Sequence, residues 1–190
     1  LGNSLIFTAI ISSSTLHTPM YFFLGLLSVF DMLFPSVTCP KMLFYLSVRS
    51  PAISYKGCAA QLFFYHLLGS TEGCLYSVMA YDRYVAICHP LRYMLIMKPG
   101  VCVSLVIIAW LVGCLHATIL TSLTFQLVYC ASNQVDYFFC DLPAVLPLAC
   151  TDSKLARKVG SINVGFLALM LLFSVCVSYV HIGVAILRIR

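Results

Sequence analysis

The chain has 190 residues, of which 62% are hydrophobic and only 9% are charged, and its mean hydropathy is +1.00. Soluble globular domains have about a quarter of their residues charged, so this composition excludes that class. The formal net charge of +5 is scattered without a basic run, which argues against nucleic acid as a partner. Apolar stretches near or above the ~20 residues that cross a bilayer predict an all-α, polytopic membrane helical bundle.

Five helices are expected in chain order. The first is too short to span a bilayer at roughly 1.5 Å per residue, so we expect the chain to be cut at its N-terminus. Pro19 opens the second helix, where its missing N–H is not needed. We expect one transmembrane domain over 1–190, with helices over about 1–15, 20–46, 57–86, 101–125 and 159–187 and an extracellular loop over about 129–158.

Two helices carry features that bear on packing. Pro35 and Pro40 lie inside the second helix, where each removes a backbone donor, so neighbouring groups must supply partners for the freed carbonyls. In the fourth helix the small residues Ala109, Gly113 and Ala117 recur every four positions. Such a stripe predicts close approach of another helix.

Four cysteines lie where disulfides can form. Cys58 is near the start of the third helix, and Cys130, Cys140 and Cys150 lie in the long polar loop. Because disulfides persist outside the cell, we place that loop outside and the far end of the third helix in the cytoplasm. Five Lys and Arg residues lie on the predicted cytoplasmic side and six on the other side, so their distribution does not decide the orientation. Spacing alone leaves three pairings open.

Asp31 and Glu72 are acidic residues deep in apolar sequence. At helical rise, Asp31 lies roughly 18 Å and Glu72 roughly 16 Å from the same membrane face, so the two carboxylates are at similar depth. Two neighbouring buried carboxylates share a cation, or one of them takes a proton. The alternative is that each is separately hydrogen-bonded or protonated.

No catalytic constellation is evident. The five histidines are spread over loops and helices and lack metal-ligand spacings such as His-Glu-x-x-His. No internal repeat is evident, which weakens a transporter hypothesis.

Three stretches carry a family resemblance: LHTPMYFFL at 16–24, MAYDRYVAICHPLRY at 79–93 and SYVHIGVAILRIR at 178–190. Together they resemble the signatures of olfactory receptors, a rhodopsin-like branch of the G-protein-coupled receptors. The resemblance covers about five of that fold's seven helices, so we expect truncation at both ends. It implies a plasma-membrane receptor, not an enzyme, that detects small, mostly apolar odorants and signals to a heterotrimeric G protein. The alternatives are a receptor of the same fold for non-odorant small molecules, or a non-signalling fragment or pseudogene product.

The resemblance also implies roles for particular residues. Arg83 would be a cytoplasmic latch that pairs with Asp82 at rest and is released on activation, with Tyr84 and Tyr179 in the same G-protein-facing set. The expected disulfides are Cys58–Cys140 and Cys130–Cys150. The resemblance favours one sodium ion shared by Asp31 and Glu72, with no other cofactor.

The expected ligand pocket lies at one level of the bundle. His66 lies about 12 Å beneath the outer end of the third helix at helical rise. Gly69 and Ser70 follow on the same face. The alternative, that His66 and His116 only bond neighbouring helices, stays open. The levels match the family's pocket positions and give the candidates Tyr65, His66, Gly69, Ser70, His116, Asn163, Phe166 and Leu167.

Overall fold

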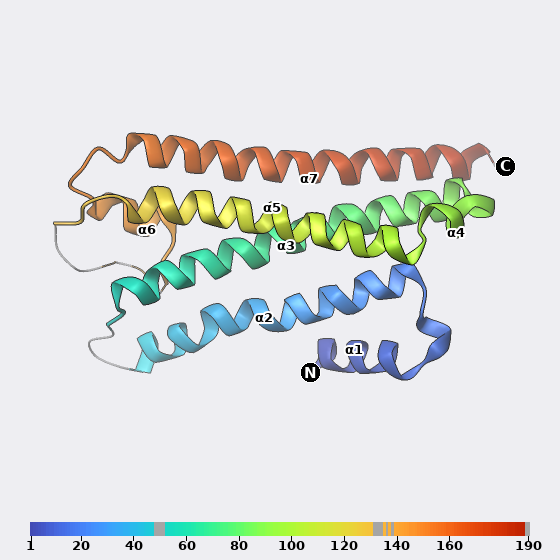
Figure 1. Cartoon of the computed structure of the whole chain (residues 1–190), viewed down its shortest axis with the longest axis horizontal. Coiled ribbons are helices and arrows are strands. Elements are labelled where there is room, and N and C mark those ends of the chain that lie inside the picture. The colour runs from blue at the N-terminus through green and yellow to red at the C-terminus, as the bar shows by residue number, and fades with distance from the viewer. Residues whose placement is uncertain (48–51, 131–134, 136, 138, 189–190) are drawn as a thin grey trace.

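The computed structural model describes residues 1–47, 52–130, 135, 137 and 139–188. These residues contain helices and one isolated β-bridge, between Tyr129 and Ala149, but no strand, so the predicted all-α bundle is confirmed. The long helices lie side by side, with α1 against α2 (Figure 1). They are α1 (Gly2–Ser12), α2 (Pro19–Ser47), α3 (Tyr55–Cys88), α5 (Pro99–Phe125) and α7 (Lys154–Arg188). The short elements are η1 (Ser14–Leu16), η2 (Pro90–Arg92), α4 (Tyr93–Ile96), α6 (Leu142–Val145) and η3 (Leu146–Leu148).

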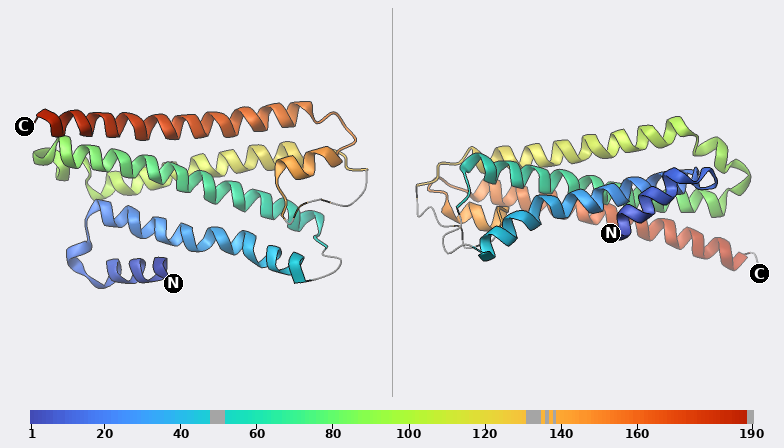
Figure 2. Two further views of the ribbon diagram at one scale, coloured as in Figure 1. Left: turned by 180° about the vertical axis from the view of Figure 1, so that it is seen from behind. Right: turned by 90° about the horizontal axis from the view of Figure 1, so that it is seen from below.

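Helix α3 is the centre of the bundle and packs against α2, α5 and α7 (Figure 2). Many of its side chains therefore meet other helices instead of lipid, where unsatisfied polar groups cost several kcal/mol. This position explains why α3 holds Gln61, Ser70, Thr71 and Asp82 as buried polar residues.

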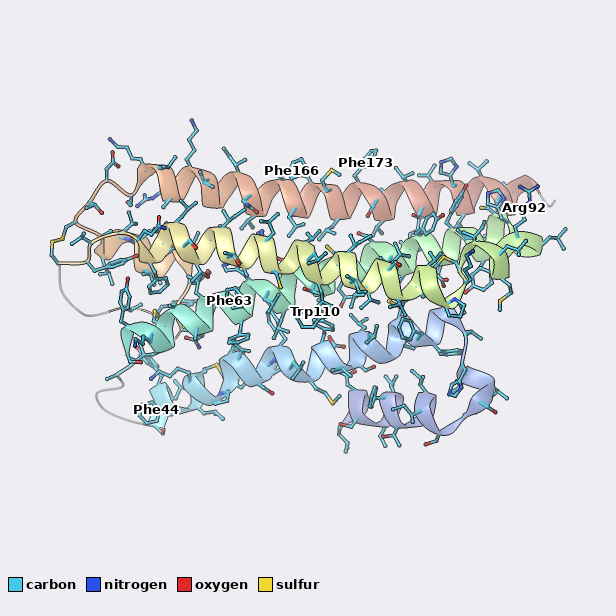
Figure 3. The ribbon with its side chains drawn as sticks, viewed as in Figure 1. Phe44, Phe63, Arg92, Trp110, Phe166 and Phe173 are labelled. Atoms are coloured by element: carbon cyan, nitrogen blue, oxygen red, sulfur yellow. A yellow bond between two sulfur atoms is a disulfide. The ribbon has the colours of Figure 1, made fainter. Side chains whose placement is uncertain are left out.

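Three helices are long and apolar enough to cross a membrane among the described residues: α2, α5 and the Lys154–Leu187 part of α7. On α7, Phe166 and Phe173 are each 65% exposed and point away from the bundle (Figure 3). Large apolar side chains on an outward face suit lipid or another apolar partner, as expected for a membrane protein.

The small-residue stripe of α5 faces α3. Ala109, Gly113 and Ala117 are all buried. A methyl group at Gly113 would overlap Thr71 Oγ1 and lie 2.9 Å from the carbonyl oxygen of Leu67. The predicted close contact is thus confirmed, with α3 as the partner helix.

Helix α2 continues through Pro35 and Pro40, and side chains bond carbonyls around both prolines. Ser36 Oγ donates to the Met32 carbonyl at 2.9 Å. Gln61 Nε2, from α3, donates to the Val37 carbonyl at 3.3 Å. These bonds reach the carbonyls directly after those of Asp31 and Ser36, which are the two that the prolines leave without a backbone N–H, so partners for the freed carbonyls stay a prediction.

Two helices begin earlier than the sequence indicated. Helix α7 begins at Lys154 instead of about 159, and the Lys154 N–H donates to Asp152 Oδ1 at 2.9 Å. Helix α3 begins at Tyr55, with Ser54 as N-cap accepting from the Gly57 N–H at 3.1 Å. Capping of the first N–H groups fixes both starts, although polar residues there resemble loop sequence.

Candidate functional site: a cavity and a polar contact at opposite ends

Two disulfides fasten the long loop. Cys58 at the start of α3 is bonded to Cys140, with their Cα atoms 5.4 Å apart. Cys130 is bonded to Cys150, with a Cα separation of 5.8 Å, and this bond closes the loop on itself. The Cys150 N–H also donates to the Val128 carbonyl at 2.9 Å. These are the two pairs that the family resemblance implies.

A cavity of about 840 Å³ lies at the disulfide end of the bundle. It lies between the long helices α3 and α7, with contributions from α2 and α5, and the loop elements α6 and η3 form part of its wall. Its lining residues are Phe34, Tyr65, His66, Gly69, Ser70, His116, Asp141, Leu142, Pro143, Leu146, Pro147, Arg157, Gly160, Ser161, Val164, Gly165, Leu167, Ala168 and Leu171.

Six of the eight predicted pocket residues line this cavity: Tyr65, His66, Gly69, Ser70, His116 and Leu167. They come from three helices that meet at one level, as the depth estimates indicated. The structure thus brings together residues about a hundred positions apart in the sequence.

The other two predicted pocket residues do not line the cavity. Phe166 points outward, because the cavity face of α7 repeats at Val164, Leu167, Ala168 and Leu171 and position 166 falls on the opposite side of the helix. Asn163 is turned toward α5, where its Oδ1 lies 2.5 Å from His116 Nδ1. Asn163 therefore contacts His116, which lines the cavity, without lining the cavity itself.

The two histidines both line the cavity and contact neighbouring helices. The rings of His66 and His116 are 5.4 Å apart between α3 and α5. His116 also bonds Asn163 on α7. Ser70 is buried at the cavity wall, and its hydroxyl makes no hydrogen bond within the described part of the chain. The cavity therefore offers a few convergent polar groups in an otherwise apolar wall.

Asp141 is the acidic group of the cavity. Its Oδ1 accepts from the Leu142 N–H at 2.8 Å, capping α6, and lies 3.5 Å from His66 Nε2. At that separation the His66 contact is an ion pair when the imidazole is protonated, instead of a well-formed hydrogen bond. Burial raises the pKa of Asp141, but the His66 imidazole and the Leu142 N–H outweigh it, so the net pKa lies below its ordinary value.

Sequence reasoning missed the loop wall of the cavity, namely Asp141, Leu142, Pro143, Leu146 and Pro147. Leu142 packs so close to α7 that a methyl group at Gly160 would lie 2.6 Å from Leu142 Cδ2. The available signal was position, because residues directly after a cysteine tied to the top of α3 must lie near a pocket at that end. The missed helical residues are Phe34, Arg157, Gly160, Ser161, Val164, Gly165, Ala168 and Leu171.

At the opposite end, Arg83 and Asp82 have separate partners. Arg83 Nη1 donates to Tyr179 Oη at 2.7 Å, and Asp82, which is 1% exposed, accepts from Tyr93 Oη at 2.9 Å. No ion pair joins Arg83 to Asp82 in the part of the chain that the structure describes. The expected resting pair is therefore not the arrangement seen here, because successive residues on a helix do not face each other.

Tyr84 and Tyr93 complete this end. Tyr84 Oη lies 3.3 Å from His89 Nε2, and the Tyr84 and His181 rings are 5.6 Å apart. Burial and the hydrogen bond to Asp82 together raise the pKa of Tyr93, so its hydroxyl stays protonated and can donate at neutral pH.

The two acids within the bundle, Asp31 and Glu72, are half-buried. Glu72 Oε1 accepts from Tyr76 Oη at 2.9 Å. Neither acid has an ion-pair partner among the described side chains. The shared sodium ion stays a prediction, and no group of three or more His, Cys, Asp or Glu side chains that could hold a metal ion occurs among the described residues.

These features define a helical protein with membrane-spanning candidates, a ligand-sized cavity at one end and a group of polar side chains around the buried Asp82 at the other. The family described as "7 transmembrane receptor (rhodopsin family)" matches residues 2–190. Human olfactory receptor 10D3 is 60% identical and mouse olfactory receptor 10D3 is 58% identical, each over all 190 residues of the chain. Mouse olfactory receptor 10D1B is 57% identical over the same residues.

The chain therefore belongs to the rhodopsin family of seven-transmembrane receptors, and the relatives named above are olfactory receptors. This confirms the resemblance in the sequence and the expectation of a receptor instead of an enzyme. The chain covers 61% of the length of each of these three relatives.

Proposed function

We propose that this chain forms the odorant-binding and signalling core of an olfactory receptor in the plasma membrane. The observation that carries the proposal is the cavity of about 840 Å³, lined by α3, α7 and the disulfide-fastened loop. Small-molecule sites typically measure about 300–1,000 Å³ and combine apolar walls with a few polar groups. The relatives' name, olfactory receptor, supports an odorant as the ligand.

The cavity chemistry supports a small, mostly apolar ligand. Leu142, Leu146 and Leu167 supply apolar surface, which gains about 25 cal/mol for each Å² that a ligand removes from water. His66 and Ser70 supply polar atoms one helical turn apart on α3. A ligand with an apolar body and one oxygen-containing group would use both kinds of surface.

The partner at the opposite end is a heterotrimeric G protein. Support comes from the Arg83–Tyr179 hydrogen bond, which joins α3 to α7 at the end of the bundle away from the cavity. When a side chain has two alternative hydrogen-bond partners, a ligand that binds one of the two arrangements more tightly shifts the protein toward that arrangement. The proposed latch set is Asp82, Arg83, Tyr84 and Tyr179.

Asp31 and Glu72 are proposed to hold one sodium ion between α2 and α3. Support comes from their half-buried carboxylates without a cationic partner among the described residues. Replacing Glu72 by Gln should abolish any effect of sodium on ligand affinity in the complete receptor. An equal sodium effect in Glu72→Gln and the unchanged receptor would refute the shared site.

The function is tested by expressing the complete receptor that contains this chain and recording cyclic-AMP responses to an odorant panel. An odorant that activates should lose potency in His66→Ala at unchanged surface expression. Responses that survive this substitution and Leu167→Ala unaltered would place the ligand outside the cavity and overturn the proposal.

A further inference from the structure

Three successive loop residues lie along α3 beside the cavity. The middle one, Cys140, is bonded to Cys58. The flanking side chains reach further down α3: the Phe139 ring lies 4.8 Å from that of Tyr65, and Asp141 lies 3.5 Å from His66. The orientation of the backbone at residue 140 therefore decides how both neighbours enter the cavity region.

Gln61 contacts this backbone directly. It lies one turn after Cys58 on the same face of α3 and is only 7% exposed. The Cys140 N–H donates to Gln61 Oε1 at 3.1 Å. On its other side, Gln61 Nε2 donates to the Val37 carbonyl of α2 at 3.3 Å. Both polar ends of one buried side chain are thus satisfied by backbone groups of different elements.

A carboxamide can make both bonds at once, because it has an acceptor and a donor on one planar group. The bond to Val37 holds the amide plane, so that the oxygen faces the Cys140 N–H. A disulfide alone leaves several rotatable bonds between the two backbones. The hydrogen bond removes rotation of the Cys140 peptide that the disulfide would permit.

We propose that Gln61 is a positioning residue for the ligand cavity, fixing the 139–141 segment so that Asp141 and α6 form the cavity wall. Asp141 caps α6 and contacts His66, so its placement connects the Gln61 bond to a lining histidine. The effect on ligands rests on the proposed function. The bracing of the loop does not.

The first experiment needs no ligand. In the purified complete receptor, hydrogen exchange is measured over 139–145 in Gln61→Met, which keeps the length of the side chain but loses both polar groups. We expect the Cys140 amide to exchange roughly five- to tenfold faster, the effect of losing one net hydrogen bond. Gln126→Met is the control, since Gln126 is exposed at the end of α5 and its side chain bonds nothing within the described residues.

Gln61→Glu separates hydrogen bonding from packing. Met and Glu have similar size, so the two variants differ mainly in hydrogen bonding. Glutamate retains an acceptor for the Cys140 N–H, and exchange at that amide should therefore stay near that of the unchanged receptor. Equal acceleration in both variants, or none in Gln61→Met, would overturn the proposal. If Gln61→Met reaches the membrane poorly, Gln61→Asn, which withdraws both groups by one methylene, should give the same acceleration.

The second experiment tests the consequence for the cavity. Straight-chain alcohols and aldehydes of medium length serve as probes in the cyclic-AMP assay. We expect Gln61→Met to change the potency of activating probes several-fold at equal surface expression, and Gln126→Met to leave it unchanged. Faster exchange without any potency change would refute the cavity role. Activation unaffected by every cavity substitution would instead refute the proposed function, with the exchange result standing by itself.

Discussion

Arg83 and Tyr179 are joined by a 2.7 Å hydrogen bond across 96 positions of sequence, linking α3 to α7. The donor is a charged guanidinium, and hydrogen bonds to charged groups contribute about 1.5–3 kcal/mol. This contact stabilises one arrangement of the two helices relative to any arrangement in which Arg83 bonds another group. At this end of the bundle, α3 and α7 are therefore joined by a defined hydrogen bond that a single substitution can remove.

Replacing Tyr179 by Phe removes only the accepting oxygen. Arg83 would pair with Asp82 at rest, so its bond to Tyr179 would belong to the activated arrangement, and losing this charge-assisted bond should lower ligand-driven signalling by roughly tenfold in efficacy or potency. Cyclic-AMP dose–response curves at matched surface expression measure this. Tyr81→Phe is the control, because Tyr81 is exposed and its hydroxyl bonds nothing in the described structure. Unchanged signalling in Tyr179→Phe would remove this contact from the latch.

Leu167 and Phe166 are neighbours in sequence on α7, but only Leu167 lines the cavity. Leu167→Ala should lower odorant potency by roughly ten- to fiftyfold, since it removes three carbons and each carbon buried against a ligand contributes up to about 0.8 kcal/mol. Phe166→Ala should have no effect on potency, because its ring points away from the bundle (Figure 3). A larger potency loss in Phe166→Ala than in Leu167→Ala would contradict the cavity assignment.

The contrast between these two residues shows what the sequence could predict. Depth along a helix follows from residue counts, so the level of the cavity and the positions of His66, Ser70 and His116 were predictable. Rotation about the axis of α7 was not, because apolar residues cover most of that helix and no polar face marks the inside. Phe166 was therefore placed on the wrong side.

The partner of Asp82 and the loop wall escaped prediction for a related reason, although Tyr179, which bonds Arg83, was in the predicted set. Asp82 adjoins Arg83 in sequence, but its true partner, Tyr93, lies past the end of α3 where the chain turns back. The loop wall likewise depends on how α6 folds over the bundle after Cys140. Tertiary packing decides both, whereas the helices and the α5 stripe follow from local pattern.

Gly113 tests the α3–α5 contact. Gly113→Ala would place a methyl group against Thr71 and the Leu67 carbonyl, so the helices must separate. We expect a destabilisation of about 1–3 kcal/mol, as for other overpacked contacts, seen as a lower melting temperature in detergent. Gly183→Ala is matched, since no atom lies near its added methyl group, and should be neutral or stabilising by up to about 1 kcal/mol. Equal melting temperatures for the two variants would show that the contact is not tight.

The stability of the contact between the long loop and α3 depends on pH through Asp141. Its pKa is lowered in the folded protein, so the folded state binds the proton less well than the unfolded chain, whose Asp pKa is about 3.9. The stabilisation by Asp141 is therefore fully present above about pH 4–5 and is lost as the pH falls through the folded pKa.

Hydrogen exchange over α6 should be steady from neutral pH to about pH 5, after correction for the intrinsic rate, and should accelerate below that. In Asp141→Asn this acid step should disappear, with faster exchange already at neutral pH because the charged partner of His66 is gone. Asp152→Asn is the control, since Asp152 is exposed and lies outside the cavity lining. An acid step of the same size in Asp141→Asn would show that another group loosens the loop.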